Sequence, residues 1–327
     1  AATAALFSVS CEKGGEPAAA PAAPSDAPAA PAESSKGAEK GETSSVAPAT
    51  AVVEPRVLAE EAVEPSGGEW PQWGRNGHNN MSSGAKDLSL EITSGEIGEG
   101  GQIVGAKGAK WAIKLGSQAY GTPTVYQGQV FVGTNNEEPR IEAIKGDHGI
   151  LMAFDEKTGD LNWQFSVPKL GAGKVSDWEY LGICSSILLD GKNGYVVTNR
   201  GEIVCLDLYG LSDGNDGPFQ DEDKYAAVGL EKLESAEPID KGEKGADIIW
   251  GYDMRSELGV FPHNITSSSV VLAGDKIFAS TSNGVDWSHI NIPAPTAPCL
   301  IALDKETGAL VGEEASGIGE RIMHCNW

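Results

Sequence analysis

One short order of residues occurs twice in this chain, and it limits the possible fold more than any other feature. The order Ala-x-Asp-x-x-Thr-Gly fills residues 302–308. It also fills an earlier stretch that ends in a tryptophan, made of Ala153, Asp155, Thr158, Gly159 and Trp163. In each copy a turn separates two apolar runs. Because the glycine can supply a positive φ angle and the Asp and Thr side chains can bond turn amides, each copy predicts a β-hairpin.

A weaker third copy lies between the other two. Its halves are residues 203–207 and 247–250, and an insertion of residues 208–246 separates them. Ahead of each copy stands another hairpin pattern, in residues 122–133, 185–198 and 268–280. The repeated unit is therefore four short strands, which is typical of the blades of a β-propeller. No segment of useful length has helical periodicity, so we predict an all-β protein, a β-propeller of four-stranded antiparallel blades.

The repeated pattern resembles the tryptophan-docking motif of the quinoprotein-like (pyrroloquinoline quinone repeat) propellers. The resemblance covers residues 70–327, although Gly312 stands where the third copy should have its tryptophan. It implies that Trp163 and Trp250 pack between neighbouring blades. The segment Trp-Pro-Gln-Trp-Gly-Arg-Asn at residues 70–76 is similar to the start of such propellers. The family includes pyrroloquinoline quinone dehydrogenases and also non-catalytic propellers such as the outer-membrane assembly lipoproteins.

The blade count predicts an incomplete propeller. Three complete units are visible in residues 69–327, and residues 321–327 have the character of a first strand of another blade. The chain also begins at Ala1 without a methionine. Since propellers of this kind close with about four to eight blades, we expect these residues to be a portion of about three blades from a longer product.

The beginning of the chain has a different composition. Residues 1–10 are apolar and small, and they resemble the remnant of a signal peptide ahead of Cys11, the expected lipidation site. Ser8 departs from the usual leucine of such signals, and the alternative is an ordinary secretory signal or a cysteine without a role. Residues 11–68 are rich in Ala, Pro and Glu, which predicts a disordered linker. We therefore expect a periplasmic or cell-surface lipoprotein held to a bacterial membrane by its lipid.

Candidate binding residues come from the longer loops, which in a propeller surround one mouth of the channel. These are Trp178, His263, Asn264, Asn283, Asp286, Trp287 and His289. Asn283, Asp286 and His289 together offer the groups needed to bind Ca²⁺ or to move a proton. The alternative is an Asx-type loop leading into a proline-rich corner, with no ligand at all. Trp178 and Trp287 could stack on a quinone or sugar ring, or simply cap the blade ends. The insertion of residues 208–246 is expected to be a surface elaboration on the opposite face.

Two functions remain open from the sequence. The first is a non-catalytic module that binds protein or glycan partners at the channel face or blade edges. The second is a dehydrogenase that uses pyrroloquinoline quinone and Ca²⁺ to oxidise alcohols or sugars, with Asp286 as base or ligand. We favour the first because the sequence has no adjacent cysteine pair, which the quinoprotein alcohol dehydrogenases carry, and no Cys-x-x-Cys. No cofactor or metal is assigned on this basis. The net charge of −23 argues against nucleic acid as a partner.

Overall fold

The computed structural model describes residues 68–79, 81–82, 91–98, 103–321 and 324–325. The predicted signal-peptide remnant, Cys11 and almost all of the predicted linker lie outside these residues. Within the described part, no helix combines the length and apolar character that crossing a membrane requires.

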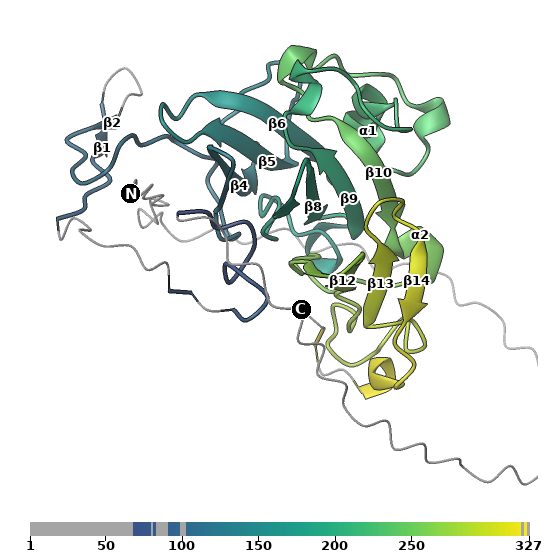
Figure 1. Ribbon diagram of the computed structural model, residues 1–327. Coiled ribbons are helices and arrows are strands. Elements are labelled where there is room, and N and C mark those ends of the chain that lie inside the picture. The colour runs from purple at the N-terminus through teal and green to yellow at the C-terminus, as the bar shows by residue number, and fades with distance from the viewer. Residues whose placement is uncertain (1–67, 80, 83–90, 99–102, 322–323, 326–327) are drawn as a thin grey trace, which may run out of the picture. The chain divides into compact units, whose positions relative to one another are not determined.

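Three four-stranded antiparallel sheets form the framework of the described chain (Figure 1). The first sheet has β3 (Thr124–Tyr126), β4 (Gln129–Asn135), β5 (His148–Asp155) and β6 (Leu161–Pro168). The second has β7 (Leu188–Asp190), β8 (Asn193–Val197), β9 (Glu202–Asp207) and β10 (Ile248–Asp253). The third has β11 (Val271–Ala273), β12 (Lys276–Ser280), β13 (Leu300–Asp304) and β14 (Leu310–Glu313). In each sheet every strand pairs with the next along the chain, which confirms the prediction of propeller blades.

Three smaller kinds of element accompany these blades. The pair β1 (Glu96–Ile97) and β2 (Ile103–Val104) forms a two-stranded sheet ahead of the first blade. Two short helices occur in the described residues, α1 (Glu222–Val228) and α2 (Met254–Leu258). The remaining turns of 3₁₀ helix are η1 (Gly173–Val175), η2 (Gly210–Ser212), η3 (Leu233–Ser235), η4 (Gly242–Lys244) and η5 (Ile318–Arg321).

The second blade is buried on both faces, because alternate residues of its strands pack on different neighbours. On β9, Val204 and Leu206 join the core shared with the first blade. Ile203 and Cys205 join the core shared with the third blade. This follows from the two-residue period of a β-strand. Each such side chain contributes about 1.5–3 kcal/mol on burial, so the stacked faces are a main source of stability.

A tryptophan from one blade docks on the turn of the next. The indole N–H of Trp163 donates to the carbonyl of Leu208 at 2.9 Å, and that of Trp250 donates to the carbonyl of Lys305 at 3.2 Å. Both tryptophans are buried between blades. Trp111, which the sequence reading did not single out, makes the same bond to the carbonyl of Glu156 at 3.0 Å. Each accepting carbonyl belongs to the residue that follows the aspartate of a blade turn.

The glycine of each turn leaves room for the incoming indole. A Cβ atom on Gly159 would lie 2.7 Å from Trp111, and one on Gly308 would lie 2.4 Å from Trp250. Both glycines also have positive φ angles, 78° and 71°. The turn aspartate completes the arrangement, since the carboxylate of Asp155 accepts the N–H groups of Lys157 and Thr158 at 2.8 Å each. These bonds, Thr158 first, lower the pKa of Asp155.

Most residues of the insertion between β9 and β10 are exposed or half-buried, but its helix α1 joins the core, which the interpretation as a surface elaboration did not include. Tyr225 of α1 is buried, and its ring stacks on Phe165 of β6 with ring centroids 5.2 Å apart. Its hydroxyl donates to Glu202 of β9 at 2.6 Å, and Arg200 bonds the same carboxylate at 3.1 Å. The sequence concealed this because a short helix within a polar stretch gives little periodic signal.

The segment at residues 70–76 lies against the first strands of two blades. Trp70 and Val125 of β3 exchange backbone hydrogen bonds of 2.7 and 2.9 Å. The carbonyl of Pro71 accepts the N–H of Leu189 in β7 at 2.8 Å. The segment therefore ties the first blade to the second.

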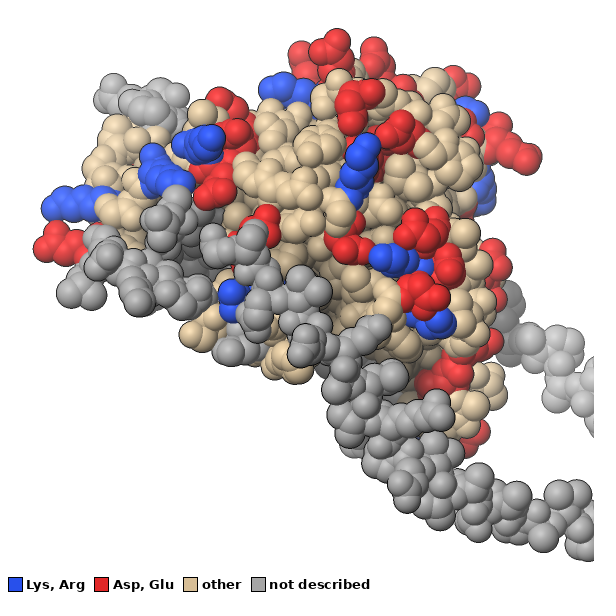
Figure 2. Space-filling view, in the orientation of Figure 1, with Lys and Arg blue, Asp and Glu red and all other residues tan. Residues whose placement is uncertain are grey.

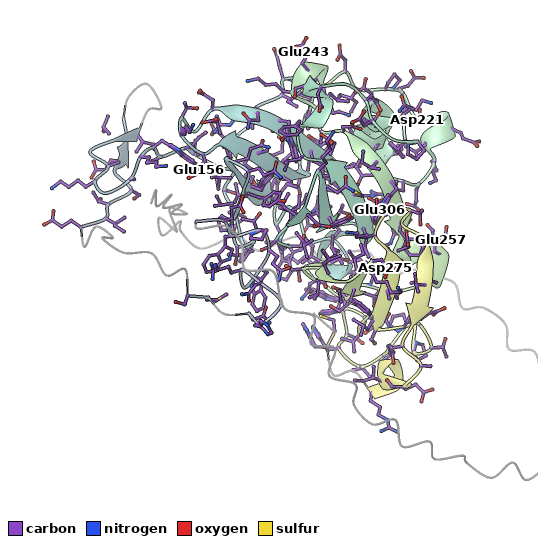
Figure 3. The ribbon with its side chains drawn as sticks, viewed as in Figure 1. Glu156, Asp221, Glu243, Glu257, Asp275 and Glu306 are labelled. Carbon is purple, nitrogen blue, oxygen red and sulfur yellow. The ribbon has the colours of Figure 1, made fainter. Side chains whose placement is uncertain are left out.

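On the face shown in Figure 2, acidic side chains are more widespread than basic ones, and lysine and arginine are interspersed among them. The acidic residues labelled in Figure 3 come from turns and helices rather than from the middles of strands. Glu156 and Glu306 lie at equivalent turns of the first and third blades, and Asp221 and Glu243 lie on the insertion. This distribution follows from the burial of most strand residues, which leaves the turns and loops as the main places for exposed charge.

Candidate functional site

The predicted site residues come from three loops. Asn283, Asp286, Trp287 and His289 lie in the loop between β12 and β13. His263 and Asn264 lie between α2 and β11, and Trp178 lies between β6 and β7. Main-chain hydrogen bonds join the second loop to each of the other two, and the structure adds a fourth segment, residues 324–325, that the prediction did not include.

Asn283 holds two of these loops together and is fully buried. Its side-chain oxygen accepts the N–H of Phe261 at 2.9 Å. Its side-chain nitrogen donates to the carbonyl of Ala294 at 2.9 Å. The neighbouring Gly284 donates its N–H to the carbonyl of Phe261 at 2.9 Å. The amide of Asn283 is therefore committed to positioning backbone.

Asp286 organises its own loop. Its carboxylate accepts the N–H of Ser288 at 3.0 Å and the side-chain N–H of Asn291 at 2.8 Å, and it also accepts the Ser288 hydroxyl. The backbone N–H of Asp286 donates to the carbonyl of Asn291 at 2.9 Å. The hydroxyl of Ser288, followed by Asn291, lowers the pKa of Asp286 to about 2. Such a carboxylate is a weak base near neutral pH.

Residues 324–325 join the same backbone assembly. The N–H of Val285 donates to the carbonyl of His324 at 2.8 Å, and Gly284 forms a β-bridge with Cys325. The approach is too close for a side chain at Gly284, since a Cβ atom there would lie 2.3 Å from the His324 carbonyl oxygen. The N–H of His263 in turn donates to the carbonyl of Ser282 at 3.2 Å. Three segments far apart in the sequence are thus fixed by main-chain bonds.

Three imidazole rings meet at this assembly. The ring centroids of His263 and His324 are 4.1 Å apart, those of His263 and His289 are 4.8 Å apart, and those of His289 and His324 are 5.2 Å apart. One nitrogen from each ring lies within 4.8 Å of the others. The chain has 5 histidines in all, so most of them lie at this one place. Sequence reasoning missed His324 because nothing in its local pattern connects it to the other two.

His263 is the buried member of the cluster, with an exposed fraction of 0%. Its Nδ1 lies 2.7 Å from the carbonyl oxygen of Val285. Because a carbonyl oxygen only accepts, Nδ1 carries the proton in this pair. The Nε2 atom is buried and has no hydrogen-bond partner among the described residues. Burial is the main cause that lowers the pKa of His263, and the neighbouring His324 and His289 lower it further.

Trp178 and Asn264 serve to connect the loops. The N–H of Trp178 donates to the carbonyl of Asn264 at 2.8 Å, and the N–H of Asn264 donates to the carbonyl of Val175 at 2.8 Å. The ammonium group of Lys174 lies 5.0 Å from the centre of the Trp178 ring. Trp178 is half-buried, and the Lys174 ammonium group covers one face of its ring, so that face is not open to a stacked ligand. Of the two tryptophans predicted for ligand stacking, Trp287 is the exposed one.

The residues predicted to bind Ca²⁺ beside a quinone do not fit that role. Calcium takes six to eight oxygen ligands. The side-chain oxygen of Asn283 accepts from Phe261, and both carboxylate oxygens of Asp286 accept from Ser288 and Asn291. Together these two residues supply three side-chain oxygens, which is half or fewer of the number that Ca²⁺ takes. We therefore derive no quinone chemistry from these residues.

The fold defines the class of this protein as a β-propeller built of four-stranded repeats. Residues 97–210 match the family model described as outer membrane protein assembly factor BamB. This match covers the first blade and most of the second, and it supports the predicted pyrroloquinoline quinone repeat family. A comparison with curated proteins gives no match.

The solved structures with some likeness include a BamB protein and two quinohemoprotein alcohol dehydrogenases. BamB from Moraxella catarrhalis is 14% identical with a TM-score of 0.30, over 61% of this chain and 37% of that one. Quinohemoprotein alcohol dehydrogenase from Comamonas testosteroni is 12% identical with a TM-score of 0.40, over 75% of this chain and 27% of that one. Quinohemoprotein alcohol dehydrogenase ADHIIG from Pseudomonas putida HK5 is 14% identical with a TM-score of 0.39, over 74% and 26%. The chain thus spans much less than half of each of these proteins.

Proposed function

We propose that this protein is an exported, non-catalytic propeller module that binds a partner protein through the loop of residues 286–291. The observation that carries the proposal is the way this loop presents apolar side chains. Trp287 is 52% exposed and Ile290 is 81% exposed, although both belong to a loop closed by the bonds of Asp286. Tryptophan is one of the residue types that dominate the binding energy of protein interfaces.

The rigidity of the loop favours binding. The backbone bond between Asp286 and Asn291 and the bond from the His289 N–H to the Asp286 carbonyl at 3.0 Å fix its shape before any partner arrives. A preorganised loop loses less conformational entropy on association than a flexible one. The family description of an assembly factor for residues 97–210 agrees with a role in binding proteins. A glycan that stacks on Trp287 is the alternative partner.

Catalysis by a quinone is the less favoured function. The sequence has no adjacent cysteine pair, and Asn283 and Asp286 together offer fewer side-chain oxygens than Ca²⁺ takes. The proposed export rests on residues 1–10 and on Cys11 as a lipid attachment site, which would hold the propeller at a bacterial membrane. Mass spectrometry of the membrane fraction tests the anchor, and an unmodified Cys11 there would contradict it.

Site-specific photo-crosslinking in the producing cell tests the binding surface. A photoreactive residue in place of Ile290 should give a discrete adduct, and the additional substitution Trp287→Ala should weaken it by removing the main anchor. The matched control is the same photoreactive residue at Ile318, which is 53% exposed but lies in η5 outside the loop.

The outcome also identifies the class of partner. A tryptic peptide of a second protein joined to position 290 indicates a protein, whereas an adduct that stains for carbohydrate and yields no such peptide indicates a glycan. Equal labelling from positions 290 and 318, or no adduct from either, would contradict the proposal.

A further inference from the structure

We propose that His263, His289 and His324 form a binding site for a divalent transition-metal ion such as Zn²⁺. The inference concerns a different set of groups from the apolar anchors and does not depend on the proposed function. Three imidazoles without a thiolate are a donor set that suits Zn²⁺, Cu²⁺ or Ni²⁺. Three protein ligands leave the fourth position of a tetrahedral ion open to water or to another ligand.

His263 supplies the strongest argument. Its Nδ1–H donates to the carbonyl of Val285, and this leaves the lone pair on Nε2 to face its surroundings. Metal-binding histidines almost always donate their other ring N–H to a carbonyl or carboxylate in this way. A buried nitrogen without a partner is costly in a folded protein. Here Nε2 of His263 is buried, without a partner among the described residues, and in a cluster of two further imidazoles.

The backbone holds the three ligands in position. The backbone N–H of His263 donates to the carbonyl of Ser282, and that of Val285 donates to the carbonyl of His324. The loop that carries His289 is closed by the backbone bond from Asp286 to Asn291. Tetrahedral Zn²⁺ with bonds of about 2.0–2.1 Å needs its nitrogen ligands about 3.3 Å apart. The nitrogens lie within 4.8 Å of one another, so small rotations of the half-buried His324 and the exposed His289 would close the site.

Access and charge also favour a cation. His289 is exposed, which gives an ion a route to the buried Nε2 of His263. Asp286, whose backbone carbonyl accepts the N–H of His289, adds a carboxylate to this loop that would attract a cation. The net charge of −23 adds a long-range attraction. Because the three ligands come from three segments, a bound ion would cross-link the loops.

Titration of the full-length protein with Zn²⁺, followed by calorimetry, tests the site. We expect one ion per chain, and Co²⁺ in its place should give the intense visible absorption of a tetrahedral ion with nitrogen ligands. The substitution His289→Ala should weaken binding by at least about tenfold, since it removes a ligand. His289 is exposed, so this variant should keep the fold, which near-ultraviolet circular dichroism of the metal-free protein checks.

The matched control is His78→Ala, which removes an exposed histidine outside the cluster and should leave the affinity unchanged. A second variant, His263→Gln, removes the buried imidazole and should abolish the visible Co²⁺ bands of the tetrahedral ion. Equal affinity in the wild-type protein and His289→Ala, or an equal loss in His78→Ala, would overturn the proposal. So would a Co²⁺ spectrum of the octahedral aqueous type.

Discussion

At the scale of single residues, Asp247 shows how strongly this fold changes a buried carboxyl group. It is 0% exposed, one oxygen accepts the N–H of Asp216 at 2.7 Å, and the other has no partner among the described residues. Burial is the main cause that raises its pKa to about 6, and the charges of Glu222, Asp207 and Asp216 add to the effect. The folded state therefore holds this proton more tightly than the unfolded state does.

The substitution Asp247→Asn should stabilise the protein at pH 8. Because the folded pKa is raised, the stability that Asp247 contributes is fully present below about pH 4 and is lost as the pH rises through about 6. The gain in free energy of unfolding should be about 1–2 kcal/mol at pH 8, after allowance for solvent screening, and should vanish towards pH 4. Urea denaturation at both pH values measures it. Asp213→Asn removes an exposed charge nearby and should change little at either pH.

At the scale of elements, the contact between an indole and a turn glycine explains why the repeated motif joins blades. Trp250 ends one blade, and Gly308 lies in the turn of the next, where a Cβ atom would overlap the indole. The hydrogen bond from Trp250 to the carbonyl of Lys305 fixes the same contact. The motif therefore acts between elements, and its aspartate and threonine serve the turn alone.

The substitution Gly308→Ala should destabilise the third blade by about 2–4 kcal/mol. It adds a Cβ atom 2.4 Å from Trp250 at a residue whose φ is 71°, so overpacking and backbone strain act together. Gly274→Ala is the matched control, because φ there is 61° but no atom lies within 4 Å of the added Cβ. The control substitution should lower the free energy of unfolding by only about 1–2 kcal/mol. Chemical denaturation followed by tryptophan fluorescence compares them, and equal losses would show that the docking contact adds nothing.

At the scale of the whole molecule, the repeat predicted the blades well and the loops poorly. The strands agree with the prediction because turn residues and apolar runs act locally, as at Gly128 and Gly274. Three features were not predicted: Trp111 docks on a blade turn, Tyr225 lies in the core, and His324 joins the histidine cluster. Tyr225 and His324 make contacts between segments far apart in the sequence, and neither recurs in the other blades, so no period reveals them. Trp111 does recur, because it lies 45 residues ahead of its acceptor as Trp163 does, but it precedes the first complete copy of the motif.

Contacts that the sequence pattern does not reveal also explain why the predicted site residues serve the loop structure. Asn283, Asp286 and His289 lie in one loop, as their spacing implies, but hydrogen bonds to Phe261 and Asn291 direct the polar groups into the loop structure. Such partners are invisible in a pattern of residue types. Trp287 and Ile290 are exposed on this closed loop, and their exposure is the basis of the proposed binding role.

A spectroscopic titration with pyrroloquinoline quinone and Ca²⁺ tests most directly the central claim, that this propeller binds partners and does not catalyse. The full-length protein should give no saturable change in the quinone absorbance, and it should reduce no dye when alcohols or sugars are added, because Asn283 and Asp286 supply fewer oxygens than Ca²⁺ takes. A saturable change accompanied by dye reduction would contradict the account.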